Sequence, residues 1–183
     1  MSKVYEVLDD RLKAFIAAQK MFFVGTAPLS GEGLVNLSPK GYDSLKIIDD
    51  LTVAYCDLGG SGVETLAHVR ENERITLMFC AFEGAANILR LYGRGEAVTV
   101  GEPGFEEAMA MFPNFDRARA VITVHITRIA DSCGWAVPFY EFKGEREQLR
   151  RWMADRTEEE WLERRYATNA TSLDGLTGLV RPQ

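Results

Sequence analysis

A glycine-rich turn followed by hydroxyl side chains is the first stretch of this sequence whose residue types could do chemistry. Residues 59–62 read Gly-Gly-Ser-Gly, and Thr65 follows at the start of an expected helix over residues 64–71. Glycines let backbone N–H groups converge, a helix N-terminus adds partial positive charge, and the two hydroxyls are further donors. These features together suit a phosphate group. The same residues would also make a plain turn with Ser61 as helix cap, and the turn is not a P-loop because no Gly-Lys-Ser/Thr follows.

Three polar side chains alternate along the expected strand over residues 34–38 and just beyond its end. Asn36, Ser38 and Lys40 are two residues apart, so all three can share one face of the strand. Polar groups with this spacing either face solvent or line a binding site. In a binding site, the lysine cation would favour a ligand on which negative charge develops.

The histidines and cysteines indicate no second site. His68 and His125 have no Cys, Asp or Glu at metal-ligand spacing, so we expect no structural metal. Cys133 would be a reactive thiol if exposed and a structural residue if buried. The aromatic residues that follow it could wall a pocket or belong to the core: Trp135, Tyr140 and Phe142.

The elements that must position these residues are mostly strands. Alternation of apolar and polar residues predicts strands over residues 21–26, 34–38, 44–48, 51–57, 74–82, 88–100 and 121–126. Helical spacing predicts helices over residues 8–19, capped by Asp9 or Asp10, over 64–71, and from near Pro103 to Phe112. Several short strands in succession suggest a small barrel.

The sequence changes character at Gly144. We predict one β-barrel domain over residues 1–143 and a helical extension over residues 144–183 that packs on it. The extension should contain two helices joined near Thr157, where Thr157 and Glu160 form a capping box. Trp152 and Trp161 are its largest apolar anchors.

Bulk composition limits the class of protein. The 183 residues carry a net charge of -6, which argues against a nucleic-acid-binding surface. No apolar run approaches the roughly 20 residues that span a bilayer, so we expect no membrane partner. The three cysteines are not paired at CxxC spacing, which favours a reducing, cytoplasmic setting.

The order of these pieces resembles the pyridoxamine 5'-phosphate oxidase-like family of FMN-binding split barrels. The resemblance covers residues 11–130 and rests on spacing. It includes a strand ending in Lys40, a strand through Tyr55, the Ser/Gly turn, a helix ending Arg-Glu-Asn, and a strand ending in Gly-x-Gly. It implies a mainly β fold with peripheral helices, an FMN-binding split β-barrel, and a homodimer with the cofactor between subunits.

The resemblance also implies site residues. The turn and helix start would hold the FMN phosphate, Lys40 would lie near the flavin ring, and Arg90 would reach the partner's cofactor, or else face water or pair with Glu96. The full set of expected cofactor-binding residues is Asn36, Leu37, Ser38, Lys40, Tyr55, Ser61, Gly62, Thr65 and Arg90.

Two departures from the family pattern bear on function. The family often begins the strand before Lys40 with Arg, where this chain has Val35 or Asn36, so one expected phosphate contact is either missing or supplied from elsewhere. True pyridoxamine phosphate oxidases also have a C-terminal Arg-x-His substrate motif, and residues 166–183 contain no histidine. We therefore expect an FMN-dependent oxidoreductase acting on an unidentified small molecule, with no catalytic residue assigned. The alternatives are the same fold binding the deazaflavin F420 or haem, or a cofactor-free binding module.

Overall fold

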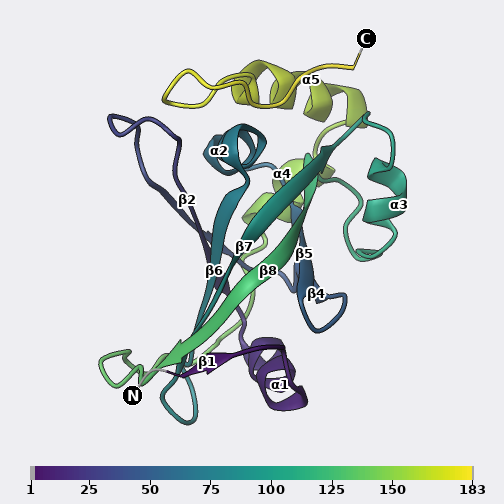
Figure 1. Cartoon of the computed structure of the whole chain (residues 1–183). Helices are drawn as coiled ribbons and strands as arrows, with labels where there is room; N and C mark the ends of the chain where they lie inside the picture. The colour runs from purple at the N-terminus through teal and green to yellow at the C-terminus, as the bar shows by residue number, and fades with distance from the viewer. Residues whose placement is uncertain (1–2, 183) are drawn as a thin grey trace.

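The computed structural model describes residues 3–182 as a curled antiparallel sheet with helices at both ends (Figure 1). The sheet order is β3-β2-β6-β7-β8-β5-β4, and β1 pairs with β8 off this path. The strands are β1 (Val4–Tyr5), β2 (Phe22–Thr26), β3 (Asn36–Lys40), β4 (Leu45–Ile47), β5 (Thr52–Asp57), β6 (Arg74–Cys80), β7 (Ile88–Thr99) and β8 (Ala120–Ser132). The helices are α1 (Asp10–Ala18), α2 (Glu64–Asn72), α3 (Phe105–Met109), α4 (Gln148–Ala154) and α5 (Glu158–Asn169). This is the predicted mainly β split barrel with peripheral helices. The predicted domain over residues 1–143 and the predicted extension over residues 144–183 include residues 1–2 and 183, which lie outside the described residues.

The two longest strands, β7 and β8, form the spine of the sheet. Their register shifts between Tyr92 and Gly93, which marks a β-bulge. A Cβ on Gly93 would lie 2.4 Å from the carbonyl oxygen of His125, so only glycine allows the strands to approach this closely. Figure 1 shows α1 at one end of this spine and α2 and α5 at the other.

Strand β5 is buried on both faces. As alternation predicts, Val53 and Tyr55 point one way, into the main core, while Ala54 and Cys56 point the other way. The second face is covered by Phe105 and its neighbours, which form a smaller apolar cluster. Helix α3 is shorter than the predicted segment ending at residue 112, because its chain turns again directly after Met109.

Strand β3 begins and ends later than predicted. The sequence suggested residues 34–38 with a break at Pro39, whereas the strand spans Asn36–Lys40 and Pro39 pairs with Phe23 of β2. Proline is tolerated in β3 because β3 is an edge strand of the sheet. This extension keeps Lys40 in the strand, on the same face as Asn36 and Ser38.

The C-terminal segment lies against α2 and the turn before it. The capping box of Thr157 and Glu160 is present at the start of α5, as predicted. Trp161 is buried, whereas Trp152 is partly exposed. Leu179 packs on Val63 and Leu66 at the start of α2. Within residues 3–182, no helix has both the length and the apolar character needed to cross a membrane.

Candidate cofactor-binding site

A cavity of about 310 Å³ lies between strand β3 and the start of helix α2. One wall is the inner face of β3, and the other is the glycine-rich turn with the first residues of α2. The cavity gathers side chains from segments that are far apart in the sequence: Asn36, Ser38, Pro39, Lys40, Gly60, Ser61, Gly62, Glu64, Thr65 and Arg119. Six of the nine residues expected to bind a cofactor are therefore brought together here. From Asn36 to Lys40 the strand runs roughly 13 Å, which is long enough to follow an extended ligand.

A chain of hydrogen bonds orients Thr65 at the back of the cavity. The side-chain amide of Asn36 donates to the hydroxyl of Thr65 at 2.9 Å and to that of Thr26 at 3.1 Å. Thr26 is in turn 3.0 Å from Nδ1 of the buried His68. Because the Thr65 oxygen already accepts from Asn36, its own proton remains available to a ligand in the cavity.

The N-terminus of α2 has no side-chain cap. Val63 occupies the N-cap position, and within residues 3–182 no side chain accepts from the first N–H groups of this helix. Ser61 therefore does not act as the cap that the simpler reading of the turn required. Free N–H groups at a helix start carry partial positive charge and suit an anion.

Three charged side chains form a group beneath the turn. The Asp57 carboxylate accepts from Arg119 Nε at 3.0 Å and Nη2 at 2.9 Å, and lies 3.3 Å from Lys40 Nζ. Burial alone would raise the pKa of the Asp57 carboxyl, but Arg119 and Lys40 outweigh burial and hold this pKa well below its usual range. Two cations thus share one buried carboxylate. The Lys40 ammonium consequently lies in the same cavity as the turn. Its predicted place beside a flavin ring stays a prediction.

Sequence reasoning missed Asp57 and Arg119. Arg119 lies immediately before β8 and donates from Nη1 to the carbonyl of Gly62 at 2.6 Å. It supplies a cation to the cavity that does not depend on an arginine at the start of β3. The available signal was a charged residue at the end of each of two apolar strands: Asp57 is the last residue of β5, and Arg119 comes directly before β8. Only the pairing of those strands shows that the two residues meet.

A second carboxylate borders the opening of the cavity. Glu64 lines it, and its Oε1 accepts from the backbone N–H of Leu173 at 3.3 Å. Glu64 is thus drawn toward the C-terminal loop, whereas Lys40 and Arg119 are drawn toward Asp57. The Oε2 of Glu64 lies against the turn, 2.3 Å from the place of a Cβ on Gly62, so the cavity holds a carboxylate as well as its cations.

Three expected site residues lie elsewhere in this chain. Leu37 points to the outer face of β3, as alternation requires, and is 65% exposed. Tyr55 is fully buried and packs edge-on against Phe22, one layer below Lys40. Arg90 lies on β7 and donates to Ser132 Oγ at 3.1 Å, rather than pairing with Glu96.

The remaining sequence candidates do not converge on the cavity. Neither histidine lines it: His68 is buried behind it, and burial lowers the pKa of its imidazole, while His125 is exposed 3.6 Å from Glu96. No group of three or more His, Cys, Asp or Glu within residues 3–182 is placed to hold a metal ion. Cys133 is a free, exposed thiol, and the aromatic side chains after it are exposed rather than in the core: Trp135, Tyr140 and Phe142.

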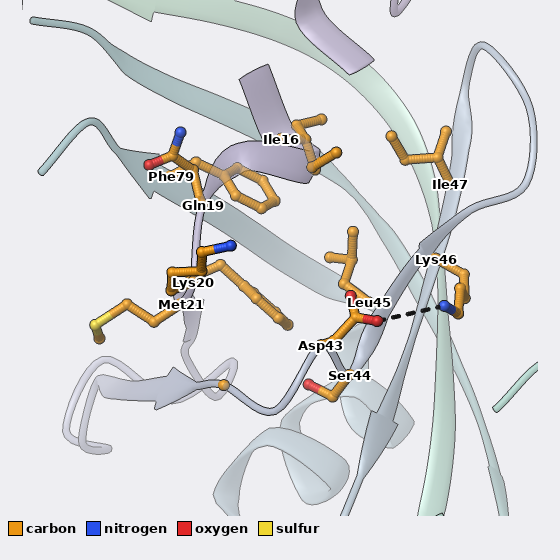
Figure 2. A pocket seen from close by; sticks show the side chains of 13 residues that line it. Ile16, Gln19, Lys20, Met21, Asp43, Ser44, Leu45, Lys46, Ile47 and Phe79 are labelled. Atoms are coloured by element: carbon orange, nitrogen blue, oxygen red, sulfur yellow. Dashed lines mark ion pairs between the residues drawn. The ribbon is translucent and has the colours of Figure 1, made fainter. Parts of the chain in front are cut away.

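A separate cavity of about 260 Å³ opens between the end of α1 and the β4 region (Figure 2). Its inner surface is apolar, with Phe22, Phe79 and Leu45, and Figure 2 shows Asp43 facing Lys46 across an ion pair of 3.7 Å. Gly41 lines this cavity directly after Lys40, but the two cavities share no residue. Because this cavity lacks the convergent donors of the first, the first is the better anion-binding candidate.

Comparison with known proteins identifies the family. A family model described as Pyridoxamine 5'-phosphate oxidase matches residues 8–133, which is more than half of the chain. The chain belongs to the pyridoxamine 5'-phosphate oxidase family. The family match includes β3, the turn, α2 and Arg119, and it ends before α4 and α5.

One curated relative supports that assignment, and two solved structures are similar in fold. The chain is 39% identical over 142 residues to the pyridoxamine 5'-phosphate oxidase family protein ustO of Aspergillus flavus, covering 75% of this chain and 56% of that protein. It therefore spans little more than half the length of this curated relative. The crystal structure of HupZ from Group A Streptococcus matches with a TM-score of 0.54 and 26% identity, covering 66% of this chain and 90% of HupZ. A candidate pyridoxamine 5'-phosphate oxidase from Lactobacillus delbrueckii matches in fold with a TM-score of 0.52 and 13% identity, covering 69% of this chain and 98% of that one.

Proposed function

We propose that this family member binds FMN, with the phosphate at the turn and the start of α2 and the remainder of the cofactor along β3. The observation that carries the proposal is the cavity itself, because it joins β3 to an uncapped helix N-terminus and to Arg119. A phosphate needs several donors that converge on one point, and this is where the chain provides them.

The donors in the cavity fit a phosphate monoester. The start of α2 offers N–H groups, Thr65 offers a hydroxyl proton, and Arg119 adds a cation. Ser38 Oγ is a buried atom with no hydrogen-bond partner within residues 3–182, and it would contact the part of the ligand that lies along β3. A bound FMN supplies two-electron redox chemistry at its ring.

The chain's own residues bind and orient the cofactor rather than transfer protons. Asp57 holds Lys40 and Arg119 through buried ion pairs, so both cations keep fixed positions before a ligand binds. Lys40 would favour the reduced ring, because negative charge develops there on reduction. We infer an oxidoreductase acting on a small molecule.

We further propose that the working unit is a homodimer in a reducing, cytoplasmic setting. A cavity of about 310 Å³ accommodates the phosphate end more readily than a whole flavin, so the ring would need a second surface. The outer face of the sheet exposes apolar side chains that a second copy could cover, including Val35, Leu37 and Tyr92. Arg90 lies on this outer face, from which it could reach the partner's cofactor. All three cysteines are free, in keeping with a reducing setting.

The absorption spectrum of the purified protein tests the proposal. We expect the visible bands of an oxidised flavin, or their appearance after reconstitution with FMN, and release of FMN on denaturation. A Soret band would indicate haem, and a deazaflavin spectrum would indicate F420. Failure to bind any of the three would leave the cofactor-free binding module as the function.

A further inference from the structure

The glycine-rich turn is held from behind by an arginine of the C-terminal extension. Arg165 of α5 is 6% exposed, and its Nη1 donates to the carbonyls of Gly59 at 2.6 Å and Gly60 at 2.7 Å. This residue lies 32 positions beyond the end of the family match at residue 133. The turn therefore has a partner that the shared part of the family does not supply.

These two contacts fix the direction of the peptide groups in the turn. In a planar trans peptide, the C=O of one residue points opposite to the N–H of the next. Since the Gly59 and Gly60 carbonyls point at Arg165, the N–H groups of Gly60 and Ser61 point away from it. Both of these residues line the cavity, and neither N–H donates to an acceptor within residues 3–182. Arg165 thus holds two free donors on the side opposite to itself.

Arg165 also adds a positive charge to the turn, and no carboxylate within residues 3–182 forms an ion pair with it. The ring of Trp152, 4.9 Å from the Cζ of Arg165, is the group that faces its guanidinium. Burial, together with Arg119, Arg164 and Arg156, lowers the pKa of Arg165. Beneath the same turn, Asp57 already serves both Lys40 and Arg119. The turn is therefore bordered by three cations and two carboxylates, the buried Asp57 and the partly buried Glu64, and the remaining positive charge suits an anion.

We propose that Arg165 is a positioning residue of the phosphate site, which fixes the turn so that its N–H groups face the ligand and which favours a phosphate monoester dianion. This inference rests on the proposed binding of FMN. A simpler role would be to anchor α5 to the barrel, and the two roles differ in what they do to the ligand. An anchor affects stability and affects all ligands equally. A positioning residue affects the phosphate in particular.

The experiment compares FMN with riboflavin, which lacks the phosphate, in titrations followed by flavin fluorescence. Arg165→Met should weaken FMN binding by about tenfold while leaving riboflavin binding unchanged. Arg165→Lys keeps the charge with fewer donors and should show a smaller loss. Arg164→Met is the matched control, because it removes the same charge from the exposed neighbouring residue, which touches no carbonyl of the turn. It should bind FMN as the unmodified protein does.

A phosphorus NMR titration of bound FMN adds a readout that an anchoring role would not change. A phosphate monoester loses its second proton near pH 6, and the cations of the turn should lower the apparent pKa of that step. In Arg165→Met, the apparent pKa of the bound phosphate should rise relative to the unmodified protein. In Arg164→Met it should stay the same.

Each outcome decides the inference. Equal FMN affinity in Arg165→Met and the unmodified protein, or an equal loss for FMN and riboflavin, overturns it while leaving FMN binding intact. If the unmodified protein binds no FMN, the proposed function and this inference both fail. If Arg165→Met does not fold, as a melting curve would reveal, Arg165→Lys serves as the test, and FMN affinity unchanged in that variant overturns the inference.

Discussion

Replacing Thr65 with Val should weaken FMN binding through the phosphate alone. Thr65 is 4% exposed, and Val has nearly the same shape, so the change removes one hydroxyl from the cavity wall without opening a gap. The hydroxyl accepts from Asn36 and keeps its proton for the ligand. A hydrogen bond to a charged group contributes about 1.5–3 kcal/mol. The dissociation constant for FMN should therefore rise roughly tenfold to a hundredfold.

Thr26→Val provides the matched control for this prediction. Thr26 is also buried and also accepts from Asn36, but it does not line the cavity. This change should lower the free energy of unfolding, because His68 Nδ1 loses its partner, and it should leave the FMN dissociation constant within a few-fold of the unmodified value. The assay is quenching of flavin fluorescence, with riboflavin titrated alongside. If both Thr variants lose FMN affinity equally, or if Thr65→Val weakens riboflavin as much as FMN, the assignment of the phosphate to α2 is wrong.

The remaining predictions concern the charged group of Lys40, Asp57 and Arg119 and the exposed sheet face. Lys40→Met should lower the midpoint potential of bound flavin relative to the control Lys46→Met, and an unchanged potential would show that Lys40 lies away from the ring. Asp57→Asn should cost about 3–5 kcal/mol of stability in denaturant at neutral pH, because it leaves two cations unpaired, whereas Asp50→Asn at an exposed pair should cost under about 1 kcal/mol. The pKa of Asp57 is lowered in the folded state, so its contribution to the free energy of unfolding is complete above the unfolded pKa of about 3.9 and is lost as the pH falls toward the folded pKa. Acidification should therefore destabilise the unmodified protein more than Asp57→Asn. Light scattering should give about twice 20.5 kDa, and a monomer that binds FMN in equal amount would contradict the dimer.

Local patterns predicted most of the elements because each depends on residues close together in the chain. Asp9 caps α1 through its side chain, and Thr157 with Glu160 caps α5, as the sequence indicated. The bounds of an edge strand depend instead on its place in the sheet. Pro39 predicts a break, and only the sheet order shows that β3 is an edge strand, where proline is tolerated. The strand β1 was missed because its two residues pair with β8, more than 120 positions away.

Local patterns likewise predict part of the candidate site and miss the rest. Asn36, Ser38 and Lys40 follow from alternation on one strand, and the turn with Thr65 follows from glycine and hydroxyl spacing. Arg119 and Arg165 reach the turn only because β8 pairs with β5 and because α5 lies over α2, and no local pattern contains either contact. Alternation also explains why Leu37, between two cavity-facing residues, points away from them.

The kind of donors in the cavity also separates haem from FMN and F420. Haem is usually held through an axial side chain such as histidine, and neither histidine of this chain is presented to the cavity. His68 is committed to Thr26 through Nδ1, with Nε2 facing Asp174 at 3.9 Å, and His125 is on the exposed side of β8. The turn and the start of α2 instead present backbone N–H groups, and such donors suit the phosphate of FMN or of F420 rather than an iron centre.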